Sequence, residues 1–320
     1  MSKIAIIIPC YNTSDYIERC LNALEEQTFK DFEVIMIDDC STDNTIDVIE
    51  KKSKHTSFSV TLLKNEKNSG PAVSRNKGIC YAESDFITFC DCDDWYDPDF
   101  LSVMHRKMME NDANLVFCGY KVVNEAKKVE LRSLVESDSL CSISEALRLD
   151  ADSLCMMMVR TSIMKTTLLP NIRNGEDMAV TPLLIEKAGG CVAISDTLYN
   201  YFRRDNSASQ SPTMQVVDSL VESFKYINSN TLGGFNKEIE FIGIRNLLYS
   251  GLITLMSFSN DKKRGNEIID WFETQFPNWW DNSYMKDLPN YKRTFLKCVH
   301  LRLYIGMRII AKIRKIVTRG

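Results

Sequence analysis

Histidine is scarce in this chain of 320 residues, and its cysteines lack the spacing of a metal site. Only three histidines occur, at His55, His105 and His300, and they lie far apart in the sequence. None of the eleven cysteines belongs to a Cys-x-x-Cys pair, and the two nearest to each other are Cys90 and Cys92. A structural zinc ion needs about four closely grouped Cys or His ligands. A zinc site is therefore poorly supported.

Long apolar segments are also missing. Residues 1–8 are too few to hold the apolar region of a secretory signal. The longest uncharged stretch, residues 246–260, has fifteen residues, several of them polar, whereas a membrane-spanning helix needs about 20 mostly apolar residues. We expect a buried core helix there. The scattered cysteines, odd in number, then indicate reduced thiols and a cytoplasmic protein.

Acidic side chains are missing from one end of the chain. Residues 290–320 hold nine Lys or Arg and no Asp or Glu, whereas residues 1–289 have a net charge of −13. Residues 293–320 show helical periodicity, with a cationic row on one side and an apolar row on the other: Arg308, Lys312, Lys315 and Arg319 against Ile309, Ile310, Ile313, Ile316 and Val317. Such a helix fits an anionic membrane surface.

A second interpretation of this basic segment stays open. A terminal helix can also pack on its own domain and leave its lysines in solvent. Nucleic acid is a poorer partner, because the remainder of the chain is acidic. We therefore expect peripheral membrane association or packing on the protein, and no binding to nucleic acid.

Apolar, β-branched runs alternate with helical patterns over the first 120 residues. The expected strands are residues 3–9, 32–37, 60–63, 86–90 and 115–120, and helices follow the first four. This alternation predicts an α/β fold with a mostly parallel sheet flanked by helices. Beyond it we expect a helix at 143–149, an apolar core segment at 156–159, a helix at 179–188 and short strands at 191–194 and 198–202. From residue 213 the pattern is helical, which predicts domains 1–212 and 213–320.

Carboxylates crowd at two of the expected strand ends. Asp38 and Asp39 follow one strand, and Asp91, Asp93 and Asp94 follow another. In parallel sheets ligands bind at the carboxyl ends of the strands. Crowded carboxylates repel one another unless a cation or a ligand is present. We therefore expect a binding site at this edge of the sheet.

The Asp91-x-Asp93 spacing suits a divalent cation. Alternate residues of an extended chain project alike, so both carboxylates can approach one ion. Hard oxygen donors prefer Mg²⁺ or Mn²⁺, and a cation with few protein ligands completes its shell with substrate phosphates. The alternative is an ordinary solvated turn or a helix cap. For Asp39 the alternative is similar, since Ser41 and Asp43 read as capping residues.

Two further segments carry candidate side chains. Residues 68–78 read as a turn entering a helix, whose first turns would bring Arg75 near an anion, although a lone arginine is more typical of a surface. Glu176 and Asp177 precede a helix. They either complement the helix dipole or supply a general base whose pKa is raised by neighbouring carboxylates.

The motifs in order resemble the family 2 glycosyltransferases. They read Ile-Pro-Cys-Tyr-Asn, Ile-Asp-Asp-Cys-Ser-Thr-Asp-Asn-Thr, Asn-x-Gly-x-x-x-Ser-Arg-Asn-x-Gly, Asp-x-Asp-Asp and Glu-Asp, and they extend over residues 3–205. Cys40 stands where glycine is commonest in that family, and Cys92 where a small residue is usual. The resemblance implies a GT-A (nucleotide-diphospho-sugar transferase) fold with inversion at the anomeric carbon.

The resemblance also implies a role for each candidate residue. Pro9 and Tyr11 would line the nucleoside pocket, Asp39 would accept from the base (usually uracil), and Arg75 would help to hold the nucleotide. Asp91 would contact the ribose or the metal. The main Mn²⁺ or Mg²⁺ ligand would be Asp93, and the base that deprotonates the acceptor would be Asp177, with Glu176 in support. A phosphate contact would come from Tyr201, Arg203 or Arg204.

The expected activity is metal-dependent transfer of one sugar from a UDP-sugar to a glycan or lipid-linked acceptor in surface polysaccharide assembly. Processive synthases of the family carry a Gln-x-x-Arg-Trp motif, which this chain lacks. One alternative is a non-catalytic nucleotide-sugar-binding scaffold. Another is a sugar nucleotidyltransferase, but that class expects a glycine-rich loop where Pro9 to Asn12 stand.

Overall fold

The computed structural model describes residues 2–126, 128–203 and 212–317. The chain divides into two compact units, Met1–Asp205 and Asn206–Gly320, which we call the N-terminal and C-terminal units. The predicted boundary at residue 212 lies seven residues beyond this division, and residues 204–211 lie outside the described residues.

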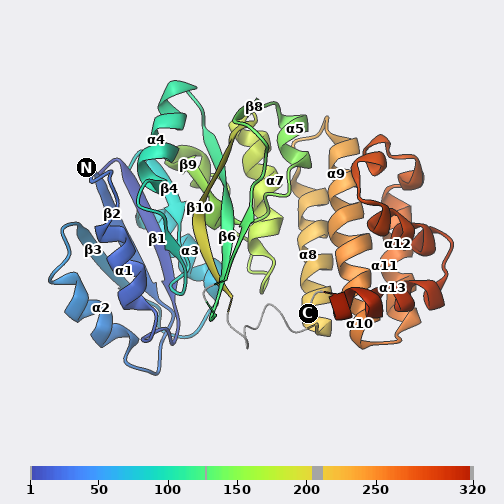
Figure 1. The fold of residues 1–320 in the computed structure, drawn as a ribbon, viewed down its shortest axis with the longest axis horizontal. Helices are drawn as coiled ribbons and strands as arrows, with labels where there is room; N and C mark the ends of the chain where they lie inside the picture. The colour runs from blue at the N-terminus through green and yellow to red at the C-terminus, as the bar shows by residue number, and fades with distance from the viewer. Residues whose placement is uncertain (1, 127, 204–211, 318–320) are drawn as a thin grey trace. The chain divides into compact units, whose positions relative to one another are not determined.

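A ten-stranded sheet forms the centre of the N-terminal unit, in the order β3-β2-β1-β4-β9-β6-β10-β5, with β7 beside β6 and β8 beside β10 (Figure 1). The strands are β1 Ile4–Cys10, β2 Phe32–Asp38, β3 Ser59–Lys64, β4 Phe86–Phe89, β5 Trp95–Tyr96, β6 Leu115–Asn124, β7 Val129–Arg132, β8 Ser139–Cys141, β9 Met157–Arg160 and β10 Cys191–Arg203.

The sheet is mixed: β1 to β4 pair with one another in parallel, as the alternation of patterns predicts, whereas β5, β7 and β8 at its other end pair antiparallel. β1 pairs with β2 and β4 in parallel, β2 with β3, and β6 with β10, whereas β9 runs antiparallel between β4 and β6. Residues Ile4–Ile8 of β1 are all inaccessible to solvent. A strand covered on both faces needs such a continuous apolar run.

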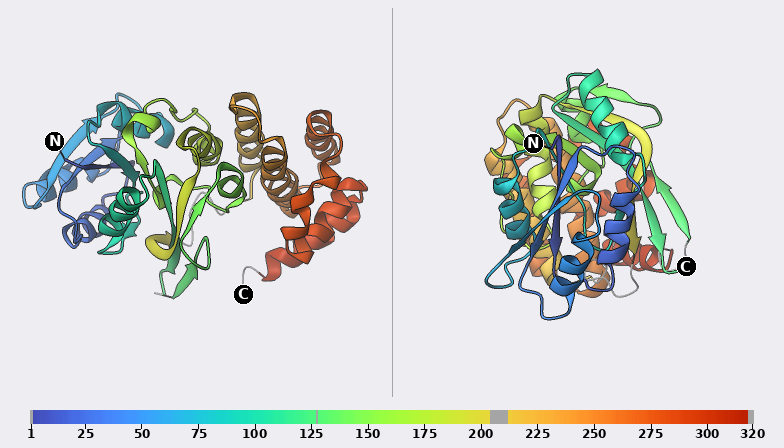
Figure 2. Two further views of the ribbon diagram at one scale, coloured as in Figure 1. Left: turned by 90° about the horizontal axis from the view of Figure 1, so that it is seen from above. Right: turned by 90° about the vertical axis from the view of Figure 1, so that its left-hand side faces the viewer.

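Helices cover both faces of the sheet, with α1 and α4 on one face and α3 and α7 on the other (Figure 2). The helices of this unit are α1 Ile17–Glu25, α2 Thr45–Ser53, α3 Pro71–Tyr81, α4 Phe100–Glu110, α5 Ile143–Arg148, η1 Leu154–Met156, α6 Thr161–Met164 and α7 Glu176–Ala188. α3 packs closely because Gly78 has no side chain: a Cβ there would lie 2.6 Å from Cγ2 of Ile7.

Two local predictions are wrong. The expected short strands at 191–194 and 198–202 form one strand, β10, because the pairing with β6 continues through register shifts between Ala193 and Tyr199. Ser41 does not cap α2; its hydroxyl accepts a hydrogen bond from the backbone of Asn12 (3.0 Å). Asp43 does act at this helix start, where its Oδ1 accepts from the backbone of Thr45 (3.0 Å).

All the secondary-structure elements in the described part of the C-terminal unit are helices, as predicted. Its elements are α8 Met214–Asn230, α9 Asn236–Gly243, the π-helix η3 Ile244–Gly251, α10 Leu252–Phe258, α11 Lys262–Gln275, η4 Trp279–Asp281, η5 Ser283–Asp287, α12 Asn290–His300 and α13 Tyr304–Val317 (Figure 1). Large side chains fill its interior: Phe224, Phe272, Trp279 and Phe295 are at most 1% exposed.

α9, η3 and α10 form one continuous helix, Asn236–Phe258, through the middle of this unit. It is the one described helix with the length and hydropathy of a membrane span, and 78% of its most apolar window is buried inside the protein. The core helix expected around residues 246–260 is therefore present, and its burial explains its apolar sequence.

Gly243 permits the close packing around this helix, and its replacement by alanine tests that packing. A Cβ there would lie 2.3 Å from Cζ of Phe224 and 2.4 Å from Cε2 of Phe272. Because overpacked cores cost about 1–3 kcal/mol, we expect Gly243→Ala to lower the free energy of unfolding by that amount, measured by urea denaturation.

Gly251 provides the matched control in the same helix. A Cβ there meets its nearest atom, the Asn246 carbonyl oxygen, at 3.7 Å. Alanine is the better helix former by about 0.5–1 kcal/mol, so Gly251→Ala should be neutral or stabilising. Equal destabilisation by both substitutions would contradict this account of Gly243.

Candidate functional site

The candidate residues gather at the carboxyl edge of the sheet. β2, β1 and β4 are adjacent and parallel, so the segments that follow them emerge side by side. Asp39 follows β2, Tyr11 follows β1, and the turn Asp91–Asp94 follows β4 (Figure 1). Tyr11 is 45% exposed, which leaves its ring accessible to a ligand. Pro9 lies within β1 beside it and is partly exposed.

Asp39 holds the turn that leads into α3. Its Oδ1 accepts hydrogen bonds from Nδ2 of Asn65 (2.8 Å) and the backbone of Ser69 (2.9 Å), and its Oδ2 accepts from the backbone of Gly70 (2.7 Å). This carboxylate is only 4% exposed. It is therefore already bonded within the protein, and its contact with a nucleobase stays a prediction.

The carboxylates of the acidic turn after β4 differ in their exposure to solvent. Asp94 is 1% exposed, and it accepts hydrogen bonds from the Tyr199 hydroxyl and from the Phe202 backbone (2.7 Å). Burial, and then the charges of Asp91 and Asp93, raise the pKa of Asp94 well above its ordinary value. Asp94 thus anchors the turn to β10, a role that the sequence analysis did not identify.

Asp91 and Asp93 remain accessible. The Asp91 side chain is 40% exposed, and Asp93 is partly exposed. The backbone carbonyl of Asp93 accepts a hydrogen bond from Arg19, and the Sγ atom of Cys92 lies 2.8 Å from that of Cys10 in β1. These contacts hold the turn against the neighbouring elements, while the side chains of Asp91 and Asp93 stay partly exposed.

These two carboxylates fit a divalent cation that also binds substrate. They are hard oxygen donors at an accessible edge, as Mg²⁺ and Mn²⁺ prefer. Within the described part of the chain, no group of three or more His, Cys, Asp or Glu side chains is placed to enclose a metal ion. In general, an ion held by few protein ligands completes its shell with substrate phosphates.

Arg75 is the centre of the site. Its Nη2 donates to Asp91 (2.8 Å), and its Nη1 donates to Glu176 (2.7 Å) and to Asp177 (3.1 Å). The side chain is 5% exposed, so the interpretation of Arg75 as a surface residue is wrong. The guanidinium joins α3, the acidic turn and the start of α7, and its predicted contact with the nucleotide stays a prediction.

Electrostatics favour a charged Arg75 and a weakly acidic Asp177. Burial lowers the pKa of Arg75, but the charges of Asp177, Asp91 and Glu176 outweigh it and hold the pKa well above its ordinary value. Burial raises the pKa of Asp177 to about 7; the Arg75 charge opposes this, and Glu176 and Asp91 add to it. A carboxylate with such a pKa can accept a proton near neutral pH.

Two cavities lie near the acidic turn, and only one of them is lined by the candidate residues. The smaller, about 370 Å³, is bordered by Asp91 together with Tyr120, Asp152, Tyr199 and Tyr201. Asp150 also lines it, so a second Asp-x-Asp segment, residues 150–152, reaches this cavity. The sequence analysis missed that segment, although its spacing equals that of Asp91 and Asp93.

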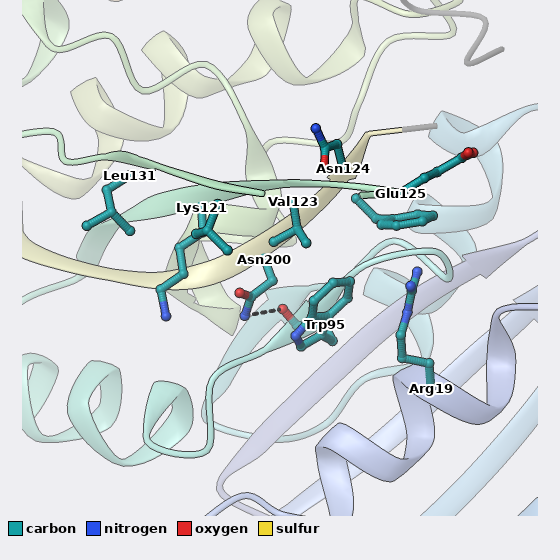
Figure 3. Close-up of a pocket in the computed structure, with 10 residues that line it drawn as sticks. Arg19, Trp95, Lys121, Val123, Asn124, Glu125, Leu131 and Asn200 are labelled. Atoms are coloured by element: carbon teal, nitrogen blue, oxygen red, sulfur yellow. Dashed lines mark hydrogen bonds between the residues drawn. The ribbon is translucent and has the colours of Figure 1, made fainter. Parts of the chain in front are cut away.

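The larger cavity, about 740 Å³, is mostly apolar (Figure 3). Trp95 and Arg19 face the strand residues Val123 and Leu131 across it. Asp91 and Tyr201 line the smaller cavity and not the larger one, so we assign the candidate active site to the smaller cavity; Asp177 is a lining residue of neither. Of the expected phosphate contacts, Tyr201 lines the smaller cavity, Arg203 is exposed, and Arg204 lies outside the described residues.

The model of the family described as Glycosyl transferase family 2 matches residues 5–168, which is about half of the chain and includes the acidic turn and Arg75. The chain belongs to glycosyl transferase family 2. It is therefore a glycosyltransferase. The residues that the resemblance singled out between Pro9 and Asp93 fall inside this match.

Curated relatives agree with this family. The chain is 28% identical over 208 residues to TuaG of Bacillus subtilis (strain 168), a glycosyltransferase named for teichuronic acid biosynthesis; the match covers 65% of this chain and 82% of TuaG. It is 29% identical over 237 residues to TarS of Staphylococcus aureus (strain MW2), a poly(ribitol-phosphate) beta-N-acetylglucosaminyltransferase, covering 71% of this chain but only 40% of TarS.

Solved structures confirm the GT-A fold. The crystal structure of S. aureus TarS 1-349 in complex with UDP superimposes with a TM-score of 0.74 at 21% identity, and the match covers 98% of this chain and 91% of that one. A mannosyltransferase from Pyrobaculum calidifontis in complex with GDP-Man and Mn²⁺ matches with a TM-score of 0.60 at 13% identity, covering 100% and 88%.

Arg75→Met tests the role of the guanidinium. The substitution leaves Asp91, Glu176 and Asp177 without their common cation, and loss of one partner from a buried ion pair costs about 3–5 kcal/mol. We expect a decrease of this size in the free energy of unfolding, measured in urea at pH 7.5.

A matched control is Arg264→Met in the C-terminal unit, because Arg264 pairs with Asp218 and Glu267 while its side chain is 30% exposed. Surface pairs contribute about 0–1 kcal/mol, so this variant should remain near the wild-type stability. If both variants lost the same small amount, Arg75 would not be the centre of the site.

Proposed function

We propose that this enzyme transfers a single sugar from a UDP-sugar to a hydroxyl of a glycan or lipid-linked acceptor, with inversion and with a divalent cation, in surface polysaccharide assembly. The observation that carries the proposal is Arg75, which holds Asp91 of the acidic turn and Asp177 of α7 in one cluster. The names of TuaG and TarS support the class of acceptor, and the UDP in the TarS structure supports the donor.

Asp177 is the proposed general base. Its Oδ1 is held by Arg75 and its Oδ2 accepts from the Leu154 backbone (3.2 Å), so its orientation is fixed from two sides. Direct displacement at the anomeric carbon needs an acceptor oxygen that loses its proton. A carboxylate with a pKa of about 7 suits that transfer, which contributes about 10²–10⁴-fold in rate.

Asp93 and Asp91 would hold the Mg²⁺ or Mn²⁺ ion. When bound, such an ion stabilises the charge of a diphosphate leaving group. Pro9, Tyr11 and Asp39 would contact the nucleoside, since they lie at the same edge of the sheet. In this arrangement Asp39 acts partly through the Ser69–Gly70 turn that it holds.

The alternative functions fit the site less well. A non-catalytic scaffold has no need of a carboxylate with a raised pKa, such as Asp177, because a raised pKa costs stability at neutral pH. A sugar nucleotidyltransferase does not accord with membership in a glycosyltransferase family. Cytoplasmic localisation forms part of the proposal, and it is supported by the eleven cysteines, all of which are free thiols.

The pH dependence of transfer tests Asp177. Because the base acts only when deprotonated, kcat/KM should fall by roughly tenfold per pH unit below pH 7 and level off above it. Asp177→Asn should lose at least about 10²-fold in kcat/KM and show no such slope.

The stability of Asp177→Asn gives an independent readout of the same pKa. The folded state holds the Asp177 proton up to about pH 7, whereas the unfolded chain releases it near pH 3.8, so the free energy of unfolding declines between these values. In Asp177→Asn this part of the decline in the free energy of unfolding should be absent, because asparagine does not bind a proton in this pH range. Near-normal turnover by Asp177→Asn would remove Asp177 from the mechanism.

UDP release from a panel of UDP-sugars tests the donor and the metal. We expect slow hydrolysis of one UDP-sugar with Mn²⁺, and a loss of about 10²-fold or more with EDTA or in Asp93→Ala, because the charge on the diphosphate is then unbalanced. Asp99→Ala is the control, since that exposed carboxylate lies outside the site.

Each result of this assay has a distinct meaning. Release that EDTA leaves unchanged would contradict the metal requirement. Binding of a UDP-sugar without release, even when glycan acceptors are added, would favour the scaffold. Failure of every UDP-sugar to bind would indicate a GDP-, CMP- or dTDP-linked donor and would contradict the uracil contact of Asp39.

A further inference from the structure

Helix α13 exposes a row of isoleucines to solvent. Ile305, Ile309 and Ile313 are 76%, 53% and 56% exposed, and their four-residue spacing places them on one side of the helix. The opposite side is packed, since Met307 is 0% and Ala311 is 2% exposed. The helix is therefore apolar on both its buried and its accessible side.

This arrangement corrects the expected geometry of the basic segment. The sequence pattern placed Ile309 and Ile313 on the side of the helix opposite the cations. In the structure, Met307 and Ala311 form the packed side, and the isoleucines lie on the accessible side beside Arg308 and Lys312. Both interpretations of the segment are then compatible, because one face packs on the C-terminal unit and the other stays accessible.

The cations beside the isoleucine row are not neutralised within the protein. Arg308 and Lys312 form no ion pair with the described residues, and residues 290–320 contain no carboxylate side chain. Arg302 differs, since its guanidinium contacts Asp270 (2.8 Å) and Glu273 (2.6 Å). Free positive charge is thus concentrated at the exposed face of α13.

The solvent-facing side of a helix is ordinarily polar, because contact between aliphatic side chains and water is unfavourable in free energy. Leu301 and Leu303, each 51% exposed, add two accessible apolar side chains in the segment just before α13. An exposed row of isoleucines beside cations without an ion-pair partner among the described residues matches the two parts of an anionic bilayer interface, its acyl region and its headgroups.

We propose that the exposed face of α13, which comprises Ile305, Ile309 and Ile313 with Arg308 and Lys312, binds an anionic lipid surface. A second copy of this chain would bring the same cations close to their equivalents, and this repulsion disfavours pairing of the two faces. The proposal does not depend on the transferase chemistry, since none of these residues belongs to the candidate active site.

Sedimentation with lipid vesicles tests the proposal on the full chain. The probes are vesicles of phosphatidylglycerol with phosphatidylcholine, and vesicles of phosphatidylcholine alone. We expect binding at least tenfold tighter to the anionic vesicles, weakened by 0.5 M NaCl because salt screens exposed charges. The triple variant Ile305→Gln, Ile309→Gln, Ile313→Gln should lose at least tenfold in binding, and glutamine retains helix propensity.

Matched control variants test whether binding depends on this face of α13 or only on the number of apolar or charged side chains in the protein. Met109→Gln, Leu140→Gln, Leu232→Gln replaces three apolar side chains of similar exposure elsewhere, and should stay within about twofold of wild type. Arg308→Gln with Lys312→Gln should reduce anionic binding toward the level for neutral vesicles. Lys263→Gln with Lys286→Gln makes the same charge change at other exposed positions and should not.

These outcomes can be told apart from failure of the proposed function. If the triple isoleucine variant loses vesicle binding but keeps the UDP-sugar turnover of the wild type in solution, the result supports binding of this face to a lipid surface. Equal vesicle binding by wild type and the triple isoleucine variant overturns it. So does a dimer, seen by analytical ultracentrifugation, that the triple variant loses while neither protein binds vesicles.

Discussion

The contact of one buried arginine with three carboxylates is the constraint on which the site depends. Arg75 extends from α3 and reaches the acidic turn after β4 on one side and the start of α7 on the other. Without that cation, Asp91, Glu176 and Asp177 would repel one another at short range in a poorly solvated place. The helix that carries Arg75 can reach them because Gly78 lets α3 approach β1 and β2.

The acidic residues around this contact differ in their surroundings. Asp94 is withdrawn from solvent and bonded to Tyr199 and Phe202, and Asp39 is bonded to the turn before α3. Asp91 and Asp93 keep accessible oxygens, and Asp177 combines burial with a partly neutralised charge. Chemically similar side chains thus differ in exposure and in pKa because of their burial and their charged neighbours, and the roles that we propose for them follow these differences.

The strands, the parallel sheet and the position of the site could be predicted from the sequence, because buried parallel strands need continuous apolar runs and ligands bind where those strands end. Which aspartate of the turn is buried could not, since Asp94 owes its burial to Tyr199, 105 residues later. The same holds for α13: periodicity shows that Ile309 and Ile313 share a face, but only the packing of Met307 and Ala311 decides which face is covered.

The hydrogen bond between Asp94 and the Phe202 backbone has a mechanical consequence. Phe202 is the last residue but one of β10, so this bond joins the acidic turn to the end of that strand, and Arg203 is the last residue described before the C-terminal unit. A force applied at that end of β10 reaches Asp94 before Asp91, because the backbone N–H of Asp91 contacts Tyr199 further back along the strand. The attachment of the acidic turn is therefore in series with the covalent link between the two units.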